Sequence, residues 1–146
     1  MATSLQAAPT AAFDLRPFDA DDTAFLFKTW LRSYRYAPPS RGIGNDDFYT
    51  GHHAVIERIL DKPSTRIVVA CLPESPTVIL GYAVADGNVL HYVLTKENFR
   101  RFGVGSALLS ALEFDGPPRL SHVTADWTHA FSRRYPASRW NPYLLG

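Results

Sequence analysis

The stretch from Lys96 to Leu109 reads KENFRRFGVGSALL, and it joins an apolar segment to a pattern typical of an apolar helix. Two arginines and two spaced glycines precede that pattern, whose apolar residues Val104, Leu108 and Leu112 recur at helical spacing. The start of a helix offers unpaired backbone N–H groups and the positive end of the helix dipole. Glycines there let the backbone approach an anion closely. The stretch therefore predicts a turn whose main-chain amides hold a diphosphate.

Two other phosphate-binding loops fit this stretch less well. The Walker type requires a lysine after its second glycine, and Gly105 is followed by Ser106. The dinucleotide type requires a third glycine or alanine where this chain has Leu108, and it begins directly after a strand. Asp126 does lie about twenty residues further on, as a ribose-binding acid would. The dinucleotide alternative therefore ranks low but stays open.

Outward from this turn, the apolar pattern predicts a mixed α/β fold of the layered α+β kind. Short connections between three consecutive strand patterns predict an antiparallel meander, so we expect a mixed, mostly antiparallel sheet flanked by helices. A segment at 140–145 is compatible with a last edge strand or a packed tail. The predicted elements are strand 13–18, a helix capped by Asp19, a helix capped by Asn45 or Asp46, strands 66–72, 77–84 and 89–95, helix 104–112, strand 121–126 and a short helix 128–134.

The composition predicts one globular domain. The chain has 146 residues, of which 46% are hydrophobic, and we expect residues 13–146 to form the domain after a loose tail over residues 1–12. A net charge of +1 gives no overall signature of nucleic-acid or membrane binding. We find no secretory signal and no apolar run long enough for a membrane helix, so we expect a cytoplasmic protein. Cys71 lies in an apolar run and is expected to be a small buried hydrophobe.

The turn also resembles the central motif of a known family. Arg100-x-x-Gly103-x-Gly105 is similar to the Arg/Gln-x-x-Gly-x-Gly/Ala motif of the GNAT (Gcn5-related N-acetyltransferase) superfamily, and the predicted element order from Phe13 to Arg134 is similar as well. Arg101 stands where glycine is commonest in that family, Glu97 stands where proline is, and the usual final hairpin is shortened or absent. In outline the chain most resembles short, divergent GNAT-like proteins of phages and prophages.

The resemblance implies a GNAT-like domain that binds acetyl-CoA or another acyl-CoA. The diphosphate would lie on the turn, and the pantetheine arm would pair with the exposed edge of the third meander strand, where the central strands splay apart. An acyl group, most simply acetyl, would pass to a primary amine by direct attack, with no metal and no covalent enzyme intermediate. The implied cofactor-binding residues are Val93, Leu94, Thr95, Arg100, Arg101, Phe102, Gly103, Val104, Gly105, Ser106 and Ala107.

Proton transfer in such a reaction has three candidate residues. Family members often use a tyrosine after the fifth strand as general acid, and Tyr135 is nearest that place, although it is equally compatible with a packed surface tyrosine. His91 on the third meander strand has a near-neutral ordinary pKa that suits a base, but it is also compatible with a hydrogen-bonded strand histidine. Asp126 would either polarise the amine or cap the next helix. Water as the base is a further alternative.

The acceptor would enter beside Tyr34, Arg35 and Tyr36, an aromatic and cationic segment that suits a peptide end, a nucleotide base or an acidic group. An ordinary loop between two helices is the competing interpretation. We expect no metal, because the histidines at positions 52, 53, 122 and 129 have no ligand spacing with Cys71 or with nearby carboxylates.

Three functions therefore stay open at this point. The first is an N-acyltransferase that acts on a small-molecule, peptide or nucleotide-linked amine. The second is a catalytically inactive GNAT-like module that binds CoA or serves as an accessory factor. The third is a nucleic-acid-associated protein that modifies a nucleobase or a tRNA-linked amine through its basic aromatic clusters, such as Arg139-Trp140. We expect a monomer or a homodimer.

Overall fold

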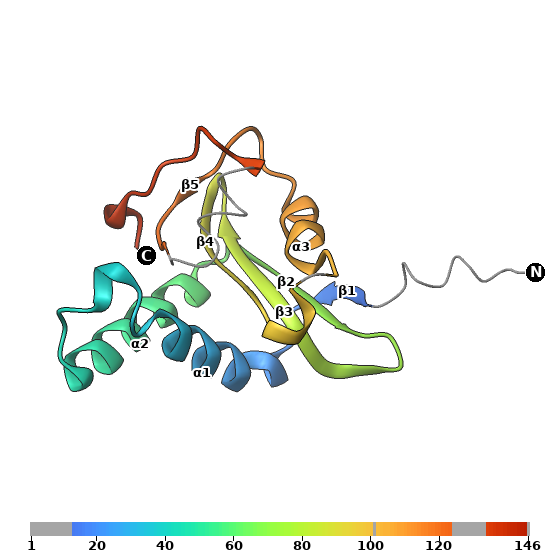
Figure 1. The fold of residues 1–146 in the computed structure, drawn as a ribbon, viewed down its shortest axis with the longest axis horizontal. Helices are drawn as coiled ribbons and strands as arrows, with labels where there is room; N and C mark the ends of the chain where they lie inside the picture. Colours follow the sequence, from blue (N-terminus) through green and yellow to red (C-terminus); the bar gives the residue numbers. More distant parts are fainter. Residues whose placement is uncertain (1–12, 101, 124–133, 146) are drawn as a thin grey trace, which may run out of the picture.

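The structure, a computed structural model, describes residues 13–100, 102–123 and 134–145. Five strands form one sheet in the order β1-β2-β3-β4-β5, with α1 and α2 on one face and α3 on the other (Figure 1). The predicted mixed α/β class with a mostly antiparallel sheet is confirmed. The bounds are β1 Asp14–Pro17, α1 Thr23–Tyr34, α2 Asn45–Asp61, β2 Thr65–Leu72, β3 Ser75–Asp86, β4 Val89–Thr95, α3 Val104–Leu112 and β5 Arg119–Leu120.

Strands β2, β3 and β4 form the predicted antiparallel meander, and β1 adds to it by pairing antiparallel with β2. Strand β3 begins earlier than predicted, because Leu72 already pairs with Ser75 and only the two intervening residues make the turn. The meander depends on Gly81. A Cβ atom at this position would lie 2.5 Å from the backbone oxygen of Leu94 and 3.2 Å from Val104 Cγ1. Glycine therefore lets β4 and α3 approach β3 closely.

The helix starts depart from the predicted caps. Asp19 precedes a 3-10 turn, Ala20–Asp22, and the Asp22 carboxylate accepts the Asp19 amide at 2.8 Å. Helix α2 is capped by Gly44, so the predicted cap at Asn45 or Asp46 is wrong. The Asn45 side chain has a different partner, because its Oδ1 accepts a hydrogen bond of 2.7 Å from Arg35 Nε.

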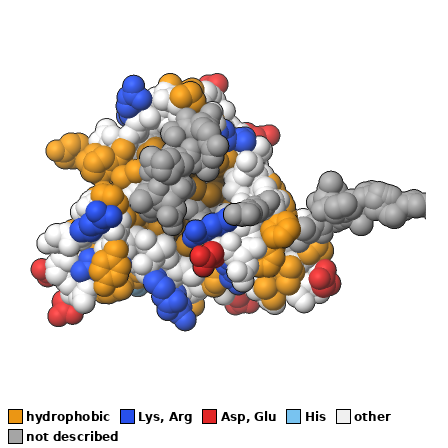
Figure 2. All heavy atoms as spheres, in the orientation of Figure 1, with side chains coloured by type: hydrophobic (Ala, Val, Ile, Leu, Met, Phe, Trp, Pro, Cys, Tyr) orange, Lys and Arg blue, Asp and Glu red, His pale blue; other side chains and the backbone are white. Residues whose placement is uncertain are grey.

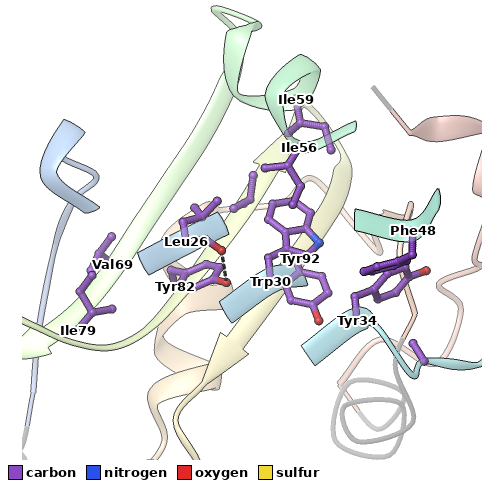
Figure 3. Packing of buried hydrophobic residues seen from close by; sticks show 12 residues of the cluster. Leu26, Trp30, Tyr34, Phe48, Ile56, Ile59, Val69, Ile79, Tyr82 and Tyr92 are labelled. Carbon is purple, nitrogen blue, oxygen red and sulfur yellow. Dashed lines mark hydrogen bonds between the residues drawn. The ribbon is translucent and has the colours of Figure 1, made fainter. Parts of the chain in front are cut away.

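Two apolar clusters fill the two layers. On the face covered by α1 and α2, the buried side chains include Leu26, Trp30 and Tyr92, and Figure 3 shows the Trp30 and Tyr92 rings packed together between helix and sheet. On the opposite face, Leu108 and Leu112 of α3 pack on the sheet. Cys71 is buried, as expected for a small hydrophobe. No helix in the described part of the chain is both long enough and apolar enough to span a membrane.

The last strand is shorter than predicted and lies earlier in the sequence. Strand β5 consists of Arg119 and Leu120 alone, which pair in parallel with Val89 and Leu90. The predicted strand 121–126 is therefore wrong over 121–123, and its remainder lies outside the described residues, as does the predicted helix 128–134 apart from its last residue. The C-terminal segment contributes one parallel bridge, between Trp140 and Leu120, and then a 3-10 turn, Pro142–Leu144.

Candidate functional site

The turn before α3 has the backbone geometry of a helix start built on glycine. After β4, a 3-10 turn over Glu97–Phe99 leads to Gly103, which has a φ of 79° in the left-handed region. That conformation is strained for any residue with a side chain. The space where a Cβ atom of Gly103 would lie is open, with no atom within 4 Å. Glycine is therefore required here by the dihedral angle rather than by crowding.

Some amides of this turn already donate hydrogen bonds within the chain, and others precede the first bond of the helix. The Phe102 amide donates to Phe99 O at 3.3 Å, and the Ala107 amide donates to Gly103 O at 3.0 Å. Both ends of the predicted diphosphate-binding span are thus hydrogen-bonded within the chain. The amides from Gly103 to Ser106 precede the Ala107 amide, which is the first to donate to a carbonyl of this helix start, so they have no acceptor within the helix. This shorter run is the part of the turn that is suited to an anion.

Strand β4 leaves an edge beside this turn. In the described residues, β5 pairs with β4 only at Val89 and Leu90. The Lys96 amide donates to Leu80 O at 2.8 Å, so alternation along the antiparallel ladder directs the peptide groups of Leu94 toward β3. The peptide groups of Val93 and Thr95 face the other edge, where Thr95 O accepts from Arg100 Nε at 3.4 Å. Of the predicted β4 residues, Val93 and Thr95 are therefore placed to pair with an extended ligand.

A chain of hydrogen bonds links three histidines and a serine on the face covered by α1 and α2. His91 Nδ1 lies 2.7 Å from Ser121 Oγ, which lies 2.8 Å from His122 Nδ1. His122 Nε2 lies 2.8 Å from His52 Nε2 on α2. His91, Ser121 and His122 are buried, whereas His52 is half-buried. We call this set the histidine chain.

His91 occupies an irregular position in β4. The pairing with β3 shifts register between Val84 and Ala85, which face Tyr92 and Leu90, so that His91 is the extra residue of a bulge. The bulge lies directly after the last residue of β4 that pairs with β5. His91, the predicted base, therefore lies where β4 and β5 separate.

Burial sets the charge of the histidine chain. Desolvation lowers the pKa of both His52 and His91 to about 4, and it lowers the pKa of His122 well below its ordinary value. Around His91, Asp86 raises and Lys62 lowers the pKa of the imidazole by smaller amounts. All three imidazoles are consequently neutral near pH 7, and each has one donor nitrogen and one acceptor nitrogen.

Aromatic rings enclose the centre of the histidine chain. Trp30 stacks on Tyr92 with ring centroids 4.7 Å apart, and the His122 ring meets Trp30 edge-on at 5.2 Å. Tyr34 approaches His122 to 4.8 Å and His52 to 5.0 Å. The labelled rings of Trp30, Tyr34 and Tyr92 all line the space between the helices and the sheet (Figure 3).

The predicted acceptor residues have three different environments. Tyr34 is buried against His122, where desolvation raises the pKa of its phenol. Arg35 is also buried, and besides its bond to Asn45 it donates to Ser40 O at 3.1 Å and to Ile43 O at 2.7 Å. Arg35 therefore holds the loop between α1 and α2. Tyr36 is 70% exposed and is the member of the three that is free to meet a ligand.

The predicted acid lies on the opposite face of the sheet from the predicted base. Tyr135 packs on the α3 side, where its ring meets Phe114 edge-on at 6.4 Å, and the neighbouring Arg134 donates to Ser110 Oγ at 2.7 Å. His91 belongs to the face covered by α1 and α2 through its bond to Ser121. The structure does not bring Tyr135 and His91 together. The predicted residues Asp126 and Arg101 lie outside the described residues.

A separate surface cleft of about 670 Å³ opens beside the start of α1. Its wall carries the ion pair of Arg16 with Asp22, whose Nη1 and Oδ2 atoms are 2.7 Å apart, and the Arg16 guanidinium lowers the pKa of the Asp22 carboxyl. Asp19 and Asp21 line the same cleft, and Lys96 lies at its edge. Three carboxylates against two cations do not favour a diphosphate there.

Charge and metal chemistry add no second site. On the described part of the face in Figure 2, basic, acidic and hydrophobic side chains are interspersed rather than gathered into a basic surface. Among the residues that the structure describes, no group of three or more histidine, cysteine or carboxylate side chains is placed to hold a metal ion. Among the described residues, the turn before α3 and the histidine chain are therefore the two candidate functional features.

Sequence reasoning missed three members of the histidine chain. His52 lies in α2 among Phe48, Val55 and Ile56, and an imidazole among apolar residues is itself a signal of a buried polar contact. Ser121 and His122 are adjacent residues just after β5, and nothing in their spacing connects them with position 52 or 91. The contact between His52 and His122 depends on the packing of α2 against the sheet.

Comparisons with known proteins agree with this architecture. No family model and no curated protein matches the sequence. The candidate acetyltransferase YycN of Bacillus subtilis is 15% identical, with a TM-score of 0.64 over 84% of this chain and 89% of that one. A candidate acetyl transferase of Pyrococcus furiosus is 16% identical, with a TM-score of 0.57 over 88% of this chain and 81% of the other.

A third similar structure is a GCN5-related N-acetyltransferase of Rhodopseudomonas palustris, which is 15% identical with a TM-score of 0.56 over 83% of this chain and 79% of that one. None of these descriptions mentions a phage protein, so the predicted phage resemblance gains no support. The sheet order, the helix on each side of it and these structural neighbours together show that the chain has the fold of the GNAT acetyltransferases.

Proposed function

We propose that this protein is an acyl-CoA-dependent N-acyltransferase that transfers an acyl group, most simply acetyl, from the CoA thioester to a primary amine. The observation that carries the proposal is the run of first-turn amides from Gly103 to Ser106 beside the edge of β4 after Leu90, with which no strand of the described residues pairs. A diphosphate fits the amides through hydrogen bonds and the helix dipole. An extended pantetheine arm fits the edge at Val93 and Thr95.

The cofactor would be held by groups with separate tasks. Main-chain amides bind the diphosphate, Arg100 supplies positive charge at the rim, and the peptide groups of β4 align the arm. Such positioning removes the entropy cost of bringing thioester and amine together, which contributes several kcal/mol, about 7 in favourable cases. His91 at the bulge would accept the proton that the attacking amine loses. Its imidazole is neutral near pH 7, and its pKa of about 4 makes it a weaker base than an exposed histidine.

Paired glycine substitutions test the proposal. Gly103→Glu adds a carboxylate to the diphosphate site, and Gly116→Glu is its matched control, because Gly116 also has a positive φ, 83°, and open space around its Cβ position. Both variants carry the same backbone strain, about 1–2 kcal/mol. Calorimetry with acetyl-CoA should show that Gly103→Glu weakens binding by at least about tenfold, whereas Gly116→Glu binds as the wild type does.

Equal binding by the two variants would show that the turn is not the cofactor site. A folded wild-type protein that binds no acetyl-CoA at high micromolar concentration would remove the proposal altogether. Binding without turnover on a panel of amines would instead support the inactive CoA-binding module.

A further inference from the structure

We propose that the histidine chain is a proton relay that carries the proton of the reacting amine from His91 through Ser121 and His122 to His52 and out to solvent. The inference rests on the proposed acyltransferase function and extends it to residues that the reaction does not otherwise require. Its basis is an unbroken series of contacts of 2.7 to 2.8 Å between side chains of β4, the segment after β5, and α2.

The two ends of the relay lie in different environments. His91 is 2% exposed and lies in the bulge where β4 and β5 separate, next to the edge proposed for the pantetheine arm. His52 is the member with substantial exposure, since His122 is fully buried and Ser121 is 1% exposed. A base at His91 therefore has no direct route to bulk water through its own side chain. The relay supplies that route.

One choice of tautomers permits the transfer in a single direction along the chain. The His91 backbone also hydrogen-bonds the His122 ring and raises its pKa, so it competes for one of the His122 nitrogens. With His91 protonated at Nδ1, that nitrogen donates to Ser121 Oγ, the serine hydroxyl donates to His122 Nδ1, and His122 Nε2 donates to His52 Nε2. Each neutral imidazole then has an acceptor on the side from which the proton arrives. In this tautomer His91 Nε2 carries no proton, and we assign it as the atom that receives the proton of the amine.

The proton balance of the step is complete. As the amine nitrogen bonds to the acyl carbon, its proton passes to His91 Nε2, directly or through one water, and the His91 Nδ1 proton moves to Ser121 Oγ. The serine proton moves to His122 Nδ1, the His122 Nε2 proton moves to His52 Nε2, and His52 Nδ1 releases a proton to water. The C–S bond breaks, and the leaving thiolate takes a proton from solvent.

Burial favours a concerted transfer along this path. A positive imidazolium in the enclosure formed by Trp30, Tyr34 and Tyr92 would be poorly solvated. If all the protons move along the chain together, no imidazolium forms, because each ring is neutral before and after the transfer. The same burial argues against simple packing as the reason for these residues, since apolar side chains would fill the space without the cost of burying polar atoms.

The test measures kcat as a function of pH for Ser121→Ala and His52→Gln, with spermidine, ethanolamine and a peptide with a free N-terminus as acceptors. The matched control is His53→Gln, the neighbouring histidine on α2, whose side chain is 49% exposed, stacks on Phe27 and pairs with Glu57 at 3.3 Å. The relay predicts that both chain variants lower kcat by roughly 10- to 100-fold, with the acetyl-CoA Kd within about twofold of the wild type. His53→Gln should retain its kcat within about twofold.

A second readout separates proton transfer from packing. His52→Ala should regain kcat when imidazole is added, because His52 is reachable from solvent, whereas Ser121→Ala should not. Unchanged kcat and unchanged solvent isotope effects in Ser121→Ala and His52→Gln, with active wild type, would overturn the relay alone. An inactive wild type that binds acetyl-CoA, or one that does not bind it, would overturn the proposed function and the relay with it.

Discussion

The absence of a Cβ atom at Gly81 decides how closely β4 and α3 approach β3. At Gly81, an added methyl group would lie 2.5 Å from the backbone oxygen of Leu94, which cannot rotate away. Gly81→Ala is therefore expected to destabilise the protein by about 1–3 kcal/mol or more. Gly51→Ala on α2 is the control, because its Cβ would meet nothing within 4 Å, and we expect it to stabilise the helix by about 0.5–1 kcal/mol. Urea unfolding measures both, and equal effects of one sign would contradict the close approach.

Two glycines and a histidine show which features a sequence can reveal. The positive φ of Gly103 follows from local rules, because a glycine that opens a helix after a polar turn indicates such a position. The need for Gly81 does not, since it arises from the approach of Leu94 and Val104, which are distant in the chain. His91 was recognised as a titratable residue on a strand, but its bond to Ser121 depends on where β5 lies.

At the scale of elements, the connection between α1 and α2 is held by one buried side chain. Arg35 donates to Asn45, Ser40 and Ile43, and its flat guanidinium matches acceptors that a lysine cannot reach together. Arg35→Lys is expected to cost about 2–3 kcal/mol, because buried acceptors lose their donors. Arg32→Lys, one turn earlier and exposed, should change stability by less than about 0.5 kcal/mol.

Chemical denaturation and limited proteolysis of the loop would measure this difference. Faster cleavage between α1 and α2 in Arg35→Lys alone is the expected pattern. Equal stability of the two variants would show that the three hydrogen bonds of Arg35 do not hold the loop.

The elements themselves were predictable where their patterns are local. The helix over 104–112 and the meander agree with the structure because apolar spacing and short turns determine them. Strand β5 begins two residues before the predicted strand, because its ladder is only two residues long and its residues give no alternating pattern. The pairing partner, rather than propensity, defines so short a strand.

The whole molecule should lose stability as the pH falls through the histidine range. His52 and His91 have folded-state pKa values of about 4, below the ordinary 6.5, so the unfolded chain binds more protons between these values. Stability is then complete above pH 6.5 and declines toward pH 4, with a slope of at most about 1.4 kcal/mol per pH unit for each histidine. His122 adds to the same trend.

Urea unfolding at several pH values between 7.5 and 5 checks this expectation. His52→Gln should reduce the slope of stability against pH. A slope that is equal in wild type and His52→Gln would show that this imidazole is not buried in the folded protein. Asp22 does not interfere in this range, because its lowered pKa keeps it ionised there.

The order of strands in the sheet has a consequence for how the chain assembles. Because β1 to β5 follow one another in space as they do in sequence, the hairpins of the meander can form from near neighbours. We expect the parallel contact of β4 with β5 to form last, because it joins elements on either side of α3 and secures only two residues. We therefore expect amide exchange to be slowest in β3 and fastest at Leu120 and Ser121, so that the seam that positions Ser121 and His122 is also the first to open.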